Sequence, residues 1–329
     1  MIPATAECAV YGGIAALGEI DGWDGMWQLT TMAIIAVALR QAVAACAGPA
    51  PPGRPSRRTH ARRIAANPPV IARVALAVAG LAVHGPRVAI FLVLAMETVS
   101  LLVALGRIPA GSRAGAGSAR IDSPAASRDA ARTPTGRTPP GSATTPTRLA
   151  IIRASRDDGA LIRWAGRLVQ GNLLPLAPAI AGLTATAMLA LLGMGNLHGI
   201  IALTPPVVML LAAPGAGHRH DGRFDWLVPV ILQAAQYLYL STLGFAWHVP
   251  APIVYLLCAL TAVWHAVLAL PIEGKPSGIG WEGRMFIAGA AAITGLASFA
   301  YPALAAYLGV LISRRVMTGT LYSLEDARR

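Results

Sequence analysis

Residues 27–47 have the sequence WQLTTMAIIAVALRQAVAACA, an apolar run about as long as a helix needs to be to cross a bilayer. The one charged residue in it, Arg40, lies in the last third, from where a long side chain can reach toward lipid headgroups. Further apolar runs follow at 70–84, 87–106, 173–193, 197–214, 226–247, 250–270 and 285–313. Because a backbone in lipid must satisfy its own hydrogen bonds, these runs predict an all-α fold, a polytopic transmembrane helix bundle of about eight or nine spans.

The composition supports a membrane protein. Only 13% of the 329 residues are charged, roughly half the usual share in a soluble domain, and 55% are hydrophobic. The net charge is +12, but the cations flank apolar runs and form no basic stripe with interleaved aromatic residues. We therefore interpret them as topology signals that contact membrane lipids, and we expect no nucleic-acid partner. The three cysteines have no metal-site spacing.

One segment interrupts the apolar pattern. Residues 107–148 consist mainly of Gly, Pro, Ser, Thr, Ala and Arg, a composition that buries too little apolar surface to offset chain entropy. We predict a disordered linker between an N-terminal membrane part, 1–106, with about three spans, and a C-terminal membrane domain, 149–329. The C-terminal domain opens with an amphipathic stretch, 149–168, and continues with five or six spans.

The arginines also predict an orientation. The arginine-rich loop 49–73 is assigned to the cytoplasm by the positive-inside rule, and alternation of the spans then brings 107–172, 215–225 and 271–284 to the same side. Two segments within 285–313, with a kink or break near Pro302, place the C-terminus there too, while the acidic N-terminus falls outside. The sequence thus predicts a multi-pass cell-membrane protein whose C-terminus and main charged loops are cytoplasmic.

Three charged clusters share the predicted cytoplasmic face: 157–159 (DDG), 218–225 (HRHDGRFD) and 280–284 (GWEGR). Asp221 and Asp225 are four residues apart, so they share one face if a helix begins there, and paired carboxylates suit Mg²⁺ or Mn²⁺. His220 can accept a proton near neutral pH. A polar loop in which Asp225 caps the next helix explains the same pattern equally well, and both interpretations stay open.

The other clusters favour structural roles. Capping of the following helix is the favoured interpretation of Asp157 and Asp158. Trp281, Glu282 and Arg284 are interpreted as an interfacial aromatic residue with a local ion pair.

Several polar residues lie inside the predicted spans. Glu97 is expected to face the bundle and to pair with Arg40 or Arg73, because an unpaired charge in hydrocarbon costs about 3 kcal/mol or more. Structural pairing and proton handling both remain open for it. His265 lies toward the inner end of its span and is expected to reach only the interface. Four aromatic residues are assigned to packing and an aromatic belt: Tyr237, Tyr239, Phe245 and Trp247.

Four stretches are similar to a known family. They are AVYGGIAALGEIDGWDGMW (9–27), RDDGALIRWAGRLVQGNLLPLAPAIAGLTAT (156–186), HDGRFDWLVPVILQAAQYLYL (220–240) and GWEGRM (280–285). Together they resemble the bacterial domain-of-unknown-function family 5941, whose members commonly accompany CDP-alcohol phosphatidyltransferases. The resemblance implies a phospholipid or glycolipid headgroup context and such a transferase as a partner.

The chain differs both from the CDP-alcohol phosphatidyltransferase signature and from the pattern of the resembling family. The transferase signature is DGxxAR followed by GxxxDxxxD, and only the spacing of Asp221 and Asp225 has a counterpart here. We therefore do not expect a working CDP-alcohol transferase. The resembling family tends to have Tyr-Asp after the histidine, where this chain has Ala266 and Val267, which argues against a catalytic role around His265.

The leading hypothesis is a membrane protein of headgroup transfer at the cytoplasmic interface. If it is an enzyme, it is a metal-dependent phosphotransferase-like one, in which Asp221 and Asp225 hold Mg²⁺ or Mn²⁺ and His220 and Glu282 are catalytic. The phosphate-binding residues would be Arg219, Arg223 and Arg284. One alternative is a non-catalytic scaffold for a partner transferase, and another is a small transporter whose path is lined by the intramembrane polar residues Glu97 and Arg40.

Overall fold

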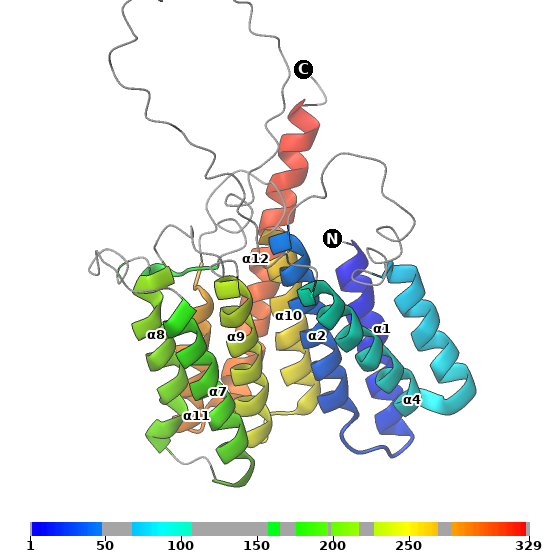
Figure 1. Ribbon diagram of the computed structural model, residues 1–329, viewed down its shortest axis with the longest axis horizontal. Coiled ribbons are helices and arrows are strands. Elements are labelled where there is room, and N and C mark those ends of the chain that lie inside the picture. The colour runs from blue at the N-terminus through cyan, green and yellow to red at the C-terminus, as the bar shows by residue number, and fades with distance from the viewer. Residues whose placement is uncertain are drawn as a thin grey trace, which may run out of the picture.

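The computed structural model describes residues 2–47, 68–106, 157–162, 164, 176–196, 199–216, 227–268 and 278–326. These residues are overwhelmingly helical and contain no strand, which confirms the predicted all-α class (Figure 1). Four helical stretches are long and apolar enough to cross a membrane: Met26–Ala44, Val70–Leu105, Leu227–Ala246 and Ala251–Leu268. The count of eight or nine spans stays a prediction.

The helices run side by side along one common direction. In chain order they are α1 (Ile2–Ile20), α2 (Met26–Ala47), α4 (Val70–Gly106), α7 (Leu176–Asn196), the 3-10 turn η1 (Gly199–Leu203), α8 (Thr204–Ala216), α9 (Leu227–Ala246), α10 (Ala251–Leu268), α11 (Trp281–Ile293) and α12 (Ala297–Asp326).

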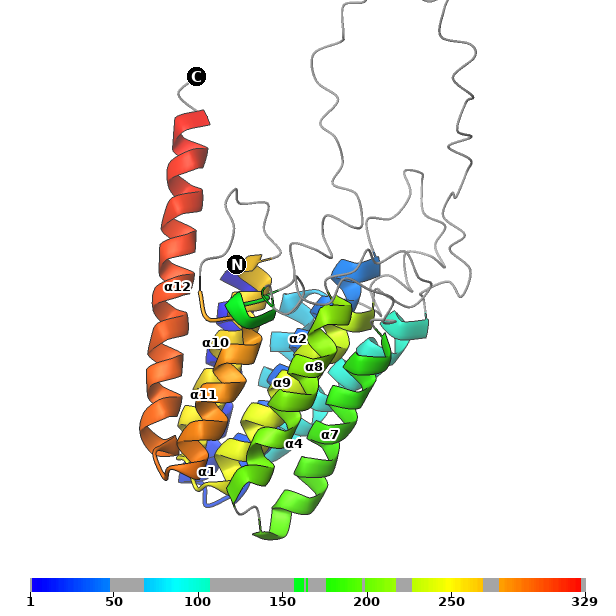
Figure 2. The ribbon, with the colours of Figure 1, turned by 90° about the vertical axis from the view of Figure 1, so that its left-hand side faces the viewer.

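The two ends of the bundle differ. The helix ends next to the undescribed segments 48–67, 107–156, 217–226 and 269–277 all lie at one end, which is uppermost in Figures 1 and 2 and is called the upper end below. The connections at 21–25, 84–87, 247–250 and 294–296 lie at the opposite, lower end.

Helix α1 was not expected, and it changes the place of the N-terminus. Helix α1 begins at the upper end, the same end beyond which α12 projects, so the expectation that the two termini lie on opposite sides is wrong (Figures 1 and 2). Glu7 is buried inside the bundle against Arg73, while Glu19 lies near the lower end, close to the turn that contains Asp21 and Asp24.

Helix α4 is a hairpin of two arms. Gly85 has φ 82°, a left-handed conformation that suits glycine, and Pro86 follows it. A Cβ on Gly80 would lie 2.8 Å from the Cα of Ala89, so the arms pack with almost no space between their backbones. The predicted segments 70–84 and 87–106, with a turn between them, are confirmed.

Two helices also form within 285–313, as predicted, but the break is not at Pro302. Helix α11 ends in a Schellman motif, in which the Leu296 N–H donates to Ala291 O (2.7 Å) and the Gly295 N–H to Ala292 O (3.2 Å). Gly295 has φ 73° and permits this turn. Pro302 lies inside α12, near its beginning, and does not interrupt the helix.

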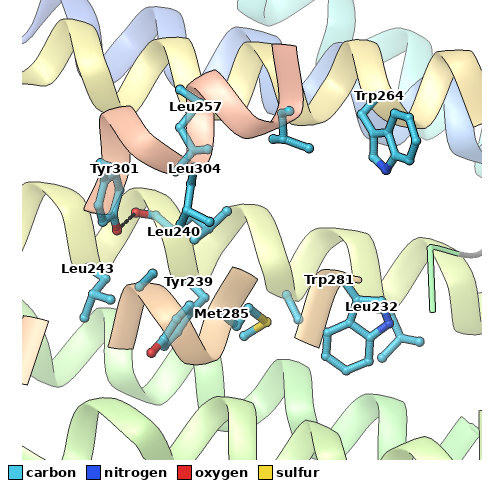
Figure 3. Packing of buried hydrophobic residues seen from close by; sticks show 14 of the residues in the cluster. Leu232, Tyr239, Leu240, Leu243, Leu257, Trp264, Trp281, Met285, Tyr301 and Leu304 are labelled. Carbon is cyan, nitrogen blue, oxygen red and sulfur yellow. Dashed lines mark hydrogen bonds between the residues drawn. The ribbon is translucent and has the colours of Figure 1, made fainter. Parts of the chain in front are cut away.

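The main apolar core lies among α9, α10, α11 and α12 (Figure 3). Tyr301 of α12 is fully buried and donates a hydrogen bond to Leu240 O of α9 (2.7 Å). A second cluster joins α1, α2 and α4 to Tyr255 and Ala259 of α10. The helices on either side of the long undescribed segment therefore pack against each other through α10.

Cysteine labelling tests this arrangement. We expect a membrane-impermeant maleimide to modify Asp24→Cys and Thr294→Cys from one side and Ile279→Cys from the other, because 24 and 294 lie at the lower end and 279 at the upper end. The native cysteines are first replaced by alanine. Labelling of positions 24 and 279 from the same side would contradict the arrangement.

Candidate functional site

Two short segments dock against each other at the upper end. The Trp281 N–H donates to Asp157 O (3.0 Å), and the Gly159 N–H donates to the Glu282 carboxylate (3.1 Å). A Cβ on Gly159 would collide with this carboxylate and with the backbone nitrogen of Gly280, and a Cβ on Gly280 would collide with Gly159. The glycines of the DDG and GWEGR clusters therefore permit a backbone contact between segments more than 100 residues apart.

A buried ion pair joins the same segments. Arg284 is fully buried and pairs with the Asp157 carboxylate, which is 8% exposed. Arg284 Nη1 also donates to Ile279 O (3.2 Å). The Gln236 side-chain oxygen, turned toward the guanidinium, accepts from Arg284 Nε (2.9 Å) and Nη2 (3.0 Å). Burial raises the pKa of Asp157, and the positive charge of Arg284 opposes that rise.

A second polar pair lies deeper in the bundle. The Tyr237 hydroxyl of α9 and Nδ1 of His265 in α10 share a hydrogen bond of 2.9 Å, and the two rings meet edge to face. Both side chains are buried. Since Nδ1 is engaged, Nε2 is the atom of His265 that remains for another partner.

A small, partly open pocket lies beside these groups. It is lined by Asp157, Asp158, Pro229, Leu232, Gln233, Gln236, His265 and Trp281. The Trp281 indole N–H donates to Asp158 Oδ1 (3.4 Å). Gln233 is only 8% exposed, yet its amide makes no hydrogen bond to any other residue that the structure describes. Residues from four parts of the chain thus line one small hollow, whose surface is mainly apolar.

Five of the predicted site residues lie outside the described residues: Arg219, His220, Asp221, Arg223 and Asp225. Within the described ranges, no group of three or more His, Cys, Asp or Glu side chains is placed to hold a metal ion. The metal site at Asp221 and Asp225 therefore stays a prediction.

The residues of the charged clusters 157–159 and 280–284 make other contacts than those predicted from the sequence. Arg284 pairs with Asp157 and not with Glu282, so the predicted local ion pair is wrong. Trp281 is 4% exposed and belongs to the interior, not to the interface. Asp157 forms an ion pair with Arg284. Glu282 of α11 accepts the backbone N–H of Gly159, the residue just before the helical residues that begin at Ala160. In each case the cause is that segments 157–159 and 280–284 pack against each other. This contact cannot be predicted from the neighbours of each residue in the sequence.

Sequence reasoning missed the polar face of α9, from which Gln233 and Gln236 line the pocket. Gln233, Gln236 and Tyr237 are three and four residues apart, so they share one face of the apolar helix α9, and that polar face was the available signal. His265 was expected only to reach the interface, yet it lines the pocket. Tyr237 and Tyr239 are fully buried, which supports packing and makes an aromatic belt wrong for these two residues.

A separate charged cluster lies among the N-terminal helices. Glu97, inside the candidate span 70–105, accepts from Arg40 Nε (2.6 Å) and contacts Arg73 Nη1 (3.4 Å). Arg73 also pairs with Glu7. We call these four residues the buried quartet. Glu97 therefore pairs with both of the arginines proposed for it, and the quartet joins α1, α2 and both arms of α4.

Glu97→Gln should destabilise the protein strongly. Removal of one partner from a buried ion pair typically costs about 3–5 kcal/mol, because the remaining charges stay buried without compensation. Thermal unfolding of the detergent-solubilised protein measures the effect. Asp24→Asn, a matched change of an exposed acid in the turn at the lower end, should leave the melting temperature nearly unchanged. Equal melting temperatures for the two variants would show that the quartet is not stabilising.

Gly159→Ala should also destabilise, because its Cβ would collide with Glu282 and Gly280 and force the docked segments apart. Overpacking of this kind costs about 1–3 kcal/mol. Gly13→Ala is the matched control, because nothing lies within 4 Å of the added methyl group and alanine favours the helix. The same thermal assay should show a loss for Gly159→Ala and none for Gly13→Ala. A Gly159→Ala protein as stable as the control would contradict the docking.

The pocket and the buried quartet are the two polar sites that the described residues form inside an otherwise apolar bundle. Comparison with known proteins identifies no relative from which a role could be transferred: no family model, no curated protein and no solved structure matches the chain.

Proposed function

We propose that the chain is a multi-pass membrane protein that acts in the transfer of a phospholipid or glycolipid headgroup at the cytoplasmic interface. The observation that carries this proposal is the small pocket at the upper end, which is lined by Asp157, Asp158, Gln233 and His265 beside Trp281. A mainly apolar hollow with a few polar side chains at its wall is the usual form of a small-molecule site. The resemblance to domain-of-unknown-function family 5941 adds the headgroup context.

We infer from the arginine-rich segments which end of the bundle faces the cytoplasm. The undescribed segments next to the upper end include the arginine-rich stretches 49–67 and 107–156, so the positive-inside rule assigns this end to the cytoplasm. A headgroup at the inner leaflet would then approach the pocket directly.

The proposed chemistry divides the charged residues into two groups. Asp221 and Asp225 come shortly before α9, whose Gln233 lines the pocket, so we keep them as ligands of Mg²⁺ or Mn²⁺, with His220 as a proton acceptor and Arg219 and Arg223 as phosphate contacts. Arg284 is buried against Asp157, and Glu282 is bonded to the backbone. We assign these two residues to the positioning of Asp157 and Asp158.

The buried quartet favours a structural role over transport. Its two carboxylates and two guanidiniums balance in charge, and each carboxylate is paired with an arginine. A transport site needs a group that is free to exchange its partner during the cycle. The pocket, whose Gln233 has no partner among the described residues, is the better candidate for binding.

Lipid analysis tests the proposal. We expect lipid extracts of a deletion strain, compared with the wild type by mass spectrometry, to lose one headgroup class and to accumulate its precursor. Re-expression of the wild-type chain should restore the profile. An unchanged lipid profile in the deletion strain would refute the headgroup function.

The same strain separates an enzyme from a scaffold. If the chain is catalytic, the double variant Asp221→Asn with Asp225→Asn should be expressed normally but should not restore the profile, because a divalent cation would lose its carboxylate ligands. A scaffold for a partner CDP-alcohol phosphatidyltransferase would restore it. Full restoration by the double variant would therefore contradict the catalytic form of the proposal.

A further inference from the structure

We propose that the buried quartet and the neighbouring Tyr11 form a hydration site inside the bundle, where bound water bridges Glu7, Tyr11 and Arg73. The inference uses residues that do not line the pocket, and it is independent of the headgroup function. It follows from three buried polar atoms, from the charge balance of the quartet and from the position of the quartet below the upper end.

The Tyr11 side chain is buried beside the quartet. Tyr11 is four residues after Glu7, so the two side chains lie on one face of α1. It interacts electrostatically with Glu7, Glu97 and Arg73, and its ring packs in the apolar cluster that joins α1, α2 and α4. Tyr11 is fully buried, yet its hydroxyl makes no hydrogen bond to any residue that the structure describes.

Two atoms of the quartet are in the same situation. Arg73 pairs with Glu7 through Nη2 and Oε1, and its Nη1 contacts Glu97. Nε of Arg73 and Oε2 of Glu7 are buried and have no hydrogen bond within the described part of the chain. Because an unsatisfied buried polar atom costs free energy, native proteins pair nearly all of them with protein groups or with ordered water. Three such atoms in one cluster therefore point to a ligand.

The charges and the hydrogen-bonding groups select water as this ligand. Two carboxylates and two guanidiniums balance, so an added ion such as Na⁺ or Cl⁻ would leave a net charge in apolar surroundings, which is strongly unfavourable. Water is neutral. It can donate to Oε2 of Glu7, accept from Nε of Arg73 and do either with the Tyr11 hydroxyl. Buried waters typically make about three such hydrogen bonds.

The quartet lies close to the upper end of the bundle. Helices α1 and α4 both begin at that end, at Ile2 and Val70, a few residues before Glu7 and Arg73 (Figure 1). With a rise of 1.5 Å per residue, Glu7 lies about 8 Å below the beginning of its helix. Charged groups inside membrane proteins commonly face the bundle interior or a water-filled cavity. Water therefore has only a short distance to travel from the aqueous side.

Radiolytic hydroxyl-radical footprinting of the full-length protein in nanodiscs tests the site. Radicals that form from a bound water oxidise the adjacent side chain even where bulk solvent does not reach. Tyr301 is the internal control, because it is equally buried but donates to Leu240 O within the apolar core. We expect Tyr11 to be oxidised several-fold faster than Tyr301. Equally slow oxidation of both residues in folded protein would overturn the inference.

Removal of the hydroxyl gives a test of opposite signs. A buried hydroxyl that is bonded to water stabilises the fold, whereas one without any partner destabilises it. We expect Tyr11→Phe to lower the melting temperature by a few degrees, as Tyr301→Phe should, since the Tyr301 hydroxyl has a backbone partner. An unchanged or higher melting temperature for Tyr11→Phe would contradict a bound water at this hydroxyl.

Salt replacement distinguishes water from an ion. Exchange of sodium chloride for potassium gluconate at equal concentration should shift the melting temperatures of the wild type and of Tyr11→Phe by the same amount, because the site holds neither ion. An ion that occupied the site would stabilise the wild type in proportion to its concentration above the dissociation constant. Stabilisation by Na⁺ or Cl⁻ that is lost in Tyr11→Phe would overturn the assignment to water.

Discussion

The buried ion pair between Asp157 and Arg284 holds the upper end of the bundle together. It joins a short segment before the helical residues at 160 to the first turn of α11, and the same guanidinium is bonded to Gln236 of α9. Three parts of the chain therefore depend on one cation. Loss of either charge would leave the other buried and unpaired, which is far more costly than loss of an exposed pair. The contact in turn requires Gly159 and Gly280, because any side chain at these positions would hold the backbones apart.

The two polar sites of the bundle illustrate different uses of buried charge. In the buried quartet the charges balance, each carboxylate is paired with an arginine, and the four residues join α1, α2 and α4. In the pocket the ion pair forms one wall, while Gln233 and Nε2 of His265 have no hydrogen-bond partner among the described residues. The hollow beside these side chains is the reason to assign binding to the pocket, and the paired charges are the reason to assign stability to the quartet.

Helix α10 packs against both the helices that hold the buried quartet and the helices that hold the pocket. Tyr255 and Ala259 pack into the N-terminal cluster, while Trp264 and Val267 pack into the main core and His265 lines the pocket. The part before the long undescribed segment and the part after it consequently share a wall. Composition divides the chain into residues 1–106 and 149–329. This division gives the order along the chain but does not reveal the packing through α10.

The sequence by itself determined the all-α class, the presence of helices long and apolar enough to cross a membrane, the hairpin around Gly85 and the division of 285–313 into two helices. Apolar length and glycine or proline breaks are local properties of the chain. The sequence also indicated Arg40 and Arg73 as partners of Glu97, since a charge inside a span needs a counter-charge. Tertiary structure alone decided that Glu7 of α1 is buried against Arg73, that Arg284 pairs with Asp157 instead of nearby Glu282, and that His265 and Gln233 line one hollow. These outcomes depend on which helices become neighbours in space, and a contact between residues more than 100 positions apart leaves no mark in the local pattern of either segment.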